Sequence, residues 1–213
     1  MQFDWSAFWP WDQFGGSKKN MHLMIAPNSE HGLSTGIPEI LASISAFISS
    51  VAAEEAERPS FNVTKDATTG EITVTTDPAF PPSKVVFRHA ETLQGELRDF
   101  RWVRLDDNTT ATKRCTKPGK LIPPGEGGGN CLQPIVWYPK RLRAEKGTPT
   151  VFKAKPPAPT VQGRYVGYYV ELYFPSKTLK YDHMQFTTPG YVWPDTLPFP
   201  KCGNFSTCAI KLV

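Results

Sequence analysis

The clearest helical pattern in the chain runs from about Ile37 to Glu55. Apolar residues recur there every three or four positions, and serines fill many of the positions between them. Pro38 and Glu39 stand in the first turn, where a missing N–H and a negative charge are both favourable. The pattern predicts an amphipathic helix whose apolar stripe packs on a large surface such as a sheet. The stripe consists of Ile37, Ile40, Leu41, Ile44, Phe47, Ile48 and Val51.

A short apolar run, Met21 to Pro27, precedes this helix and predicts a buried strand. A polar loop that carries His31 joins the two elements. Residues 1 to 57 are therefore expected to be the terminal fragment of an α/β domain. One strand and one helix cannot bury both of their faces, so the rest of the sheet is expected to come from another chain or from an upstream segment.

Beyond residue 57 the apolar period changes from that of a helix to that of strands. Residues 61–76 alternate on both sides of a turn signal, DATTG, and predict a β-hairpin. Six further strand-like segments follow, separated by Pro and Gly. The predicted fold class is α/β plus all-β, in which an immunoglobulin-like or fibronectin-like antiparallel β-sandwich occupies residues 58 to 213. The six segments are SKVVFRHAETL, RDFRWVRLDD, PIVWYPKRLRAE, TVFKA, RYVGYYVELYFP and DHMQFTTPGYVW.

Charge and apolar content exclude some classes of function. The net charge is only +4, and the densest basic stretch, YPKRLRAEK, also contains Glu145. We interpret that stretch as the solvated face of a strand rather than as a nucleic-acid site. No apolar run approaches the roughly 18 residues that a membrane span needs.

The four cysteines fall in two pairs that are close in sequence. Cys115 and Cys131 bracket a Gly/Pro-rich loop, and Cys202 and Cys208 bracket five residues near the C-terminus. Two local disulfides are expected, with four buried thiols as the alternative. A zinc site is less favoured because the sequence has no C-x-x-C pair and no histidine beside these cysteines.

Three N-x-S/T triplets, at Asn62, Asn108 and Asn204, are candidate glycosylation sites. Together with the paired cysteines they predict a secreted protein or one of the secretory-pathway lumen. The N-terminus lacks the basic and apolar pattern of a signal peptide. We therefore expect the chain to be a fragment, a processed product or the product of an internal start.

Several motifs, in the same order and spacing, resemble the C-terminal half of the PhoPQ-activated pathogenicity-related protein family. They begin with PNSEHGL and the Ser/Ile-rich helix and continue with GEITVTTDPAFPPSKVVFRHAET and RDFRWVRL. GYYVELYFP and FTTPGYVWPDTLPFPKC complete them, so that the resemblance covers about Asp4 to Cys202. It implies an α/β-hydrolase-like domain of Ser-Asp-His type before this region, with His31 at the position of the catalytic histidine, the general base.

The resemblance places the nucleophile and its elbow upstream, and Ser34 and Ser45 lie where such a fold does not hold a nucleophile. We expect the chain alone to be a non-catalytic interaction, signalling or structural protein that needs no cofactor. The alternative is the C-terminal part of a secreted serine hydrolase, completed by an upstream segment or a separate chain. His22, His89 and His183 show no metal-ligand spacing, so no metal site is predicted.

The N-terminal residues include a dense group of aromatic side chains: Trp5, Phe8, Trp9, Trp11 and Phe14. One interpretation is a lid over the apolar stripe of the helix, and the other is a surface for a ligand or partner. In both cases we expect a protein partner or an upstream segment to dock on Trp5, Phe8, Trp9, Trp11 and the helix from Ile37 to Val51.

Overall fold

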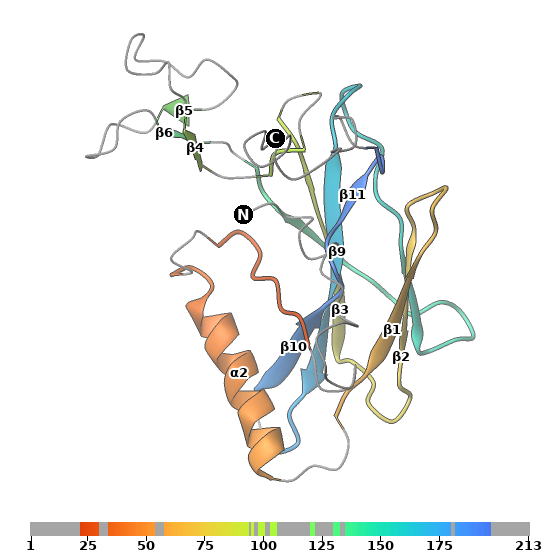
Figure 1. The fold of residues 1–213 in the computed structure, drawn as a ribbon. Helices are drawn as coiled ribbons and strands as arrows, with labels where there is room; N and C mark the ends of the chain where they lie inside the picture. The colour runs from red at the N-terminus through yellow and green to blue at the C-terminus, as the bar shows by residue number, and fades with distance from the viewer. Residues whose placement is uncertain are drawn as a thin grey trace, which may run out of the picture.

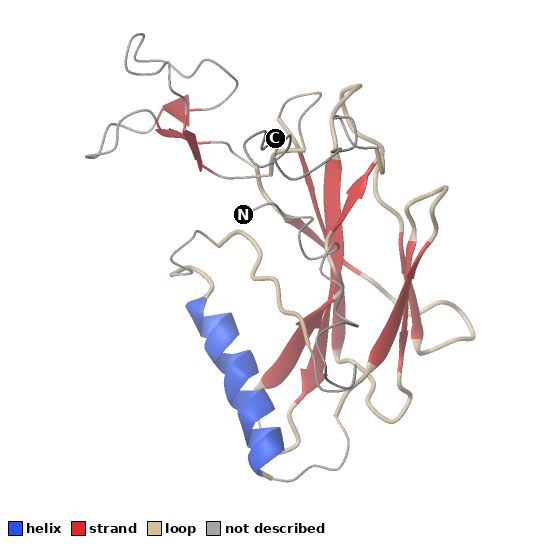
Figure 2. Cartoon of the chain, in the orientation of Figure 1, coloured by secondary structure: helices blue, strands red, loops and turns tan. Residues whose placement is uncertain are grey.

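A computed structural model of the chain describes residues 22–29, 34–53, 58–93, 95, 98–100, 103–105, 120–121, 130–132, 135–179 and 182–196. In this part of the chain one helix and eleven strands are present (Figures 1 and 2). None of its helices is long and apolar enough to cross a lipid bilayer. The elements are α2 (Ile37–Ala52), β1 (Phe61–Lys65), β2 (Ile72–Thr76), β3 (Lys84–Glu91), β4 (Val103–Leu105), β5 (Lys120–Leu121), β6 (Asn130–Leu132), β7 (Tyr138–Arg141), β8 (Val151–Ala154), β9 (Val166–Pro175), β10 (His183–Thr187) and β11 (Tyr191–Trp193).

The first sheet contains the predicted hairpin, which is confirmed. β1 and β2 pair antiparallel from Phe61 opposite Thr76 onward, and β8 adds to the other side of β2. Asp66 closes the turn, because its Oδ1 accepts the backbone N–H groups of Thr68 and Thr69. The hydrogen bond from the Thr69 backbone is the main reason that the pKa of Asp66 lies below its ordinary value. Gly70 supplies the positive φ, +71°, that ends the turn.

The second sheet is built around β9, in the order β10-β9-β3-β7, with β11 also paired to β9. All of its pairings are antiparallel. β9 is buried from Val166 to Phe174, which means that both of its faces are covered. This explains why its sequence is almost continuously apolar instead of alternating.

The two sheets pack face to face, and alternate residues of β9 fill the space between them. Tyr168, Val170 and Leu172 are fully buried there against Ile72 and Val74 of the first sheet. Figure 1 shows β1 and β2 on one side of β9 and β3, with α2 on the other side beside β10. The antiparallel, mostly β architecture predicted from the two-residue period is therefore confirmed.

An aromatic cluster covers one end of the outer face of β9. Trp137, Phe100 and Tyr169 pack there, with their ring centroids 5.4 to 5.8 Å apart in successive pairs. Gly167 makes this possible, since a Cβ at this position would lie 2.7 Å from the Trp137 ring.

The strand predicted within RDFRWVRLDD is present only as β4, which pairs with β6 in a third, small sheet of order β4-β6-β5. The other strand segments predicted after residue 80 correspond to β3, β7, β8, β9, β10 and β11.

Candidate interaction surface on helix α2

Helix α2 begins at a close contact with the preceding loop. Gly36 is the N-cap, and its carbonyl accepts the N–H of Ile40 at 3.0 Å. A Cβ at Gly36 would lie 2.4 Å from the Ser29 Oγ and 3.3 Å from the Ala26 Cβ. A side chain at this position would have to displace Ser29, so glycine lets the helix start this close to the loop.

One face of α2 packs on β10, and small residues form it. Ser43, Ala46 and Ser50 are its buried positions, at 5%, 0% and 1% exposure. The Ser43 Oγ accepts the N–H of Gln185 at 2.9 Å and donates to the carbonyl of the same residue at 3.3 Å. The helix thereby covers β10, the edge strand of the second sheet, and satisfies the outward backbone groups of Gln185.

The opposite face of α2 is apolar and exposed. Five large aliphatic side chains there are 44–59% exposed: Ile37, Leu41, Ile44, Ile48 and Val51. They follow one another by four, three, four and three residues, which keeps them in one straight row on a helix of 100° per residue. The described residues leave these five side chains uncovered, so the expected surface from another chain or an upstream segment stays a prediction. The chain packs the serine and alanine face instead, because a backbone-to-edge contact needs small side chains.

The segment before the helix, residues 22–29, lies beside β10 but forms no strand there. The predicted strand is therefore wrong over the described residues. The Leu23 carbonyl accepts the backbone N–H of Thr187 at 2.7 Å and its hydroxyl at 3.3 Å. Ser43 already occupies the outward groups of Gln185, so a regular ladder cannot continue along this edge. His22 stacks on Phe186 with ring centroids 3.9 Å apart.

Asn28 fixes the loop that leads toward His31. Its Oδ1 accepts the N–H of Trp137 at 2.8 Å, and its Nδ2 donates to the carbonyl of the same residue at 3.3 Å. Its φ of +55° is an angle that asparagine tolerates better than most residues. The prediction from sequence did not include Asn28, although the Pro-Asn pair is a recognised turn signal.

A buried ion pair lies on the same outer face of the second sheet. The side chain of Glu171 is fully buried, and its Oε1 accepts the Arg88 Nε at 3.0 Å. The Tyr173 hydroxyl donates to the other carboxylate oxygen at 3.1 Å. Burial raises the pKa of Glu171 above its ordinary value, while Arg88 opposes this and Glu39 of α2 adds to it. A single acid inside an aromatic strand, YYVELYF, was the signal that could have predicted this pair.

Most of the site residues predicted from sequence lie outside the described part of the chain. This applies to His31, to Asn108 and Asn204, to Cys115, Cys202 and Cys208, and to Trp5, Phe8, Trp9 and Trp11. The backbone of Cys131 belongs to β6, but its side chain is among those not described. Asn62 is exposed in β1, as is Thr64 of the same triplet. Among the described residues no group of three or more His, Cys, Asp or Glu could hold a metal ion.

Gly32 to Gly36 spell Gly-Leu-Ser-Thr-Gly, which matches the G-x-S-x-G pattern of a nucleophile elbow. The expectation that the nucleophile lies upstream did not consider this match. An elbow holds its serine on a strained turn between a strand and a helix. Ser34 is exposed in a turn that leads into α2, and the described residues before it, 22–29, form no strand. The pattern here begins a helix by allowing the close contact at Gly36.

The comparisons with known proteins agree with the resemblance inferred from the motifs. The model of the PhoPQ-activated pathogenicity-related protein family matches residues 4–101. Over these residues the chain is similar to that family, and the resemblance is confirmed there. Autocrine proliferation repressor protein A of Dictyostelium discoideum is 26% identical in an alignment of 196 residues, which covers 88% of this chain and 34% of that protein. The chain therefore spans about a third of the length of this curated relative. No solved structure matches the chain.

Proposed function

We propose that this chain is a non-catalytic interaction module of a secreted protein and that a further folded layer of polypeptide covers its α2 stripe. The observation that carries the proposal is the row of five exposed aliphatic side chains opposite the packed face of α2. Single exposed apolar residues are ordinary, but a contiguous row marks a contact surface. A row at i, i+4, i+7 and i+11 is the arrangement by which a helix docks on a partner.

The covering layer that fits best is an α/β-hydrolase-like domain preceding this region in the same polypeptide. The curated relative has much more chain than the part matched here, so a protein of that length would supply the layer. Residues 1 to 57 would then complete that domain, and residues 58 to 213 would form the immunoglobulin-like sandwich beside it. The relative's name describes an autocrine proliferation repressor. A signalling role outside the cell is what we propose for the protein that contains this chain.

The hydrolase alternative takes its nucleophile from an upstream segment or a separate chain, with His31 as the general base, and His31 lies outside the described residues. Labelling of Ser34 by a fluorophosphonate probe in the native protein would overturn the non-catalytic proposal.

The protein from its native source tests the proposal directly. We expect an intact mass well above the 23.8 kDa of this chain after denaturation, because the covering layer belongs to the same polypeptide. We also expect faster migration after glycosidase treatment and a mobility change on reduction, as a secreted glycoprotein with disulfides shows. Asn62→Gln should remove one glycan, since Asn62 is exposed. A native species of 23.8 kDa without glycan or disulfide would contradict both parts of the proposal.

A further inference from the structure

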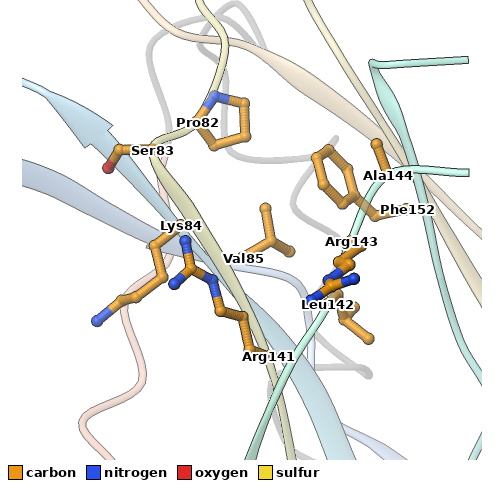
Figure 3. Close-up of a pocket in the computed structure, with 9 residues that line it drawn as sticks. All are labelled: Pro82, Ser83, Lys84, Val85, Arg141, Leu142, Arg143, Ala144 and Phe152. Atoms are coloured by element: carbon orange, nitrogen blue, oxygen red, sulfur yellow. The ribbon is translucent and has the colours of Figure 1, made fainter.

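A cavity of about 430 Å³ opens where the two sheets diverge, between the start of β3, the end of β7 and β8 (Figure 3). Its size is within the range of ligand pockets. The buried side chains of Val85 and Phe152 contribute to its apolar lining. Pro82, Leu142 and Ala144 complete that part. The cavity therefore offers room for an apolar group at the open edge of the sandwich.

Three cations accompany this apolar lining: Lys84, Arg141 and Arg143. No acidic residue is among the nine that line the cavity. Within the described residues no carboxylate forms an ion pair with Arg141 or Arg143. The Lys84 Nζ lies 3.6 Å from the centroid of the Tyr173 ring, a cation–π contact that stabilises the ammonium group and leaves its charge in place.

The register of the strands places two of these cations opposite each other. Val86 lies opposite Arg141, and the Leu142 N–H donates to the Val85 carbonyl at 2.9 Å. The next pair in the same register would be Lys84 opposite Arg143. Like charges directly opposite on a sheet are destabilising. An anion bound between them would remove that cost.

β7 is also the free edge of the second sheet, and all four of its residues are exposed. Because Leu142 bonds to β3, the alternation of an antiparallel ladder turns the peptide groups of Arg141 and Arg143 away from the sheet. Pro139 has no N–H, so pairing along this edge is limited toward the start of the strand. Among the described residues nothing pairs with this stretch of backbone, which lies directly beside the cavity and its cations.

We propose that this edge binds an extended acidic peptide in which acidic and apolar residues alternate. The peptide would add a strand to β7 through the peptide groups of Arg141 and Arg143. Side chains of a strand alternate between faces, so every second one would lie on the face of Arg141, Arg143 and Lys84, where a carboxylate is favoured. The others would lie on the face of Leu142 and Ala144 and enter the cavity. Charge complementarity and the apolar lining together favour such a peptide over a nucleic acid, which would leave the cavity unfilled.

Fluorescence anisotropy with the full chain at low salt tests the proposal. The probe is a fluorescein-labelled heptapeptide, Glu-Val-Glu-Leu-Glu-Val-Glu, and the comparison peptide has the same composition with its acidic and apolar residues in two blocks. We expect the alternating peptide to bind more tightly. Arg141→Gln and Arg143→Gln should each weaken its binding about threefold to tenfold. Lys140→Gln is the matched control, because Lys140 is on the same strand but on the other face. Its effect should stay within about twofold.

Ala144→Leu gives a second variant that changes no charge. It should fill part of the cavity and weaken binding of the alternating peptide, while binding of the blocked peptide stays the same. Equal affinity for the two peptides, or an equal loss in Lys140→Gln, would overturn the proposal. Tighter binding of a single-stranded oligonucleotide than of the peptide would show a general polyanion surface instead and would also overturn it.

Discussion

Replacing Arg88 by methionine is expected to lower the free energy of unfolding at neutral pH by about 3 to 5 kcal/mol. The side chain of Glu171 is fully buried, and that of Arg88 is 15% exposed. Removal of the cation leaves a buried carboxylate whose charge only the Tyr173 hydroxyl and the weaker 3.5 Å contact of Tyr169 still stabilise. Urea unfolding followed by circular dichroism measures the loss.

The loss of stability in Arg88→Met should depend on pH, and the direction of that dependence follows from the pKa of Glu171. Burial already raises this pKa in the folded protein above the ordinary value of 4.5. The folded state therefore binds the proton more tightly, so stability falls as pH rises from about 4.5 through the folded pKa. Arg88 opposes the shift, and its removal raises the folded pKa further. The variant should then differ least from the parent at acid pH and most above neutrality.

Two controls separate this explanation from a general packing defect. Arg164→Met removes a partly exposed ion pair with Glu91, whose side chains are 29% and 21% exposed, and should cost no more than about 1 kcal/mol. Adding Glu171→Gln to Arg88→Met removes the buried charge and keeps an acceptor for one hydroxyl. This double variant should regain stability at neutral pH and lose the pH dependence. A loss in Arg88→Met that is the same at all pH values would contradict the account.

Ala46→Gln is expected to cost about 3 kcal/mol, because Ala46 is fully buried in the core against β10. The longer side chain must displace its neighbours and bury an amide without an arranged partner. Leu41→Gln, five residues earlier on the same helix, should change stability by no more than about 0.5 kcal/mol, since Leu41 is 57% exposed. Thermal unfolding of the two variants compares the two faces.

The pair of variants decides which face of α2 packs on the sandwich. The hydrophobic pattern alone predicts the reverse, namely a severe loss in Leu41→Gln and a mild one in Ala46→Gln. That reverse order, measured in the 213-residue chain, would show that the stripe and not the small face is buried.

The sequence predicts some parts of this structure well because their cause is local. The hairpin of β1 and β2 depends on alternation and on a turn that Asp66 and Gly70 close by themselves. The length of α2 depends on its own periodicity and on Pro38. Neither requires knowledge of distant residues.

The parts that sequence did not predict depend on contacts across the chain. The orientation of α2 is set by Ser43 on Gln185, 142 residues away. Asn28 acts through Trp137, 109 residues away, and Glu171 through Arg88, 83 residues away. A helix with one apolar stripe and one small-residue face has two possible packing faces, and local pattern cannot choose between them. The choice of the small face is what leaves the stripe exposed.

Hydroxyl-radical footprinting of the native protein, read by mass spectrometry, tests the central claim that a further layer covers the α2 stripe. The 213-residue chain alone is the reference, and Val161, which is 49% exposed in a loop, is the internal control. We expect Leu41 and Ile48 to be oxidised readily in the reference and to be protected in the native protein, with Val161 oxidised equally in both. Equal oxidation of Leu41 and Ile48 in the two samples would contradict the claim. Protection in a native species of exactly twice 23.8 kDa would contradict it as well, by showing that a second copy covers the stripe.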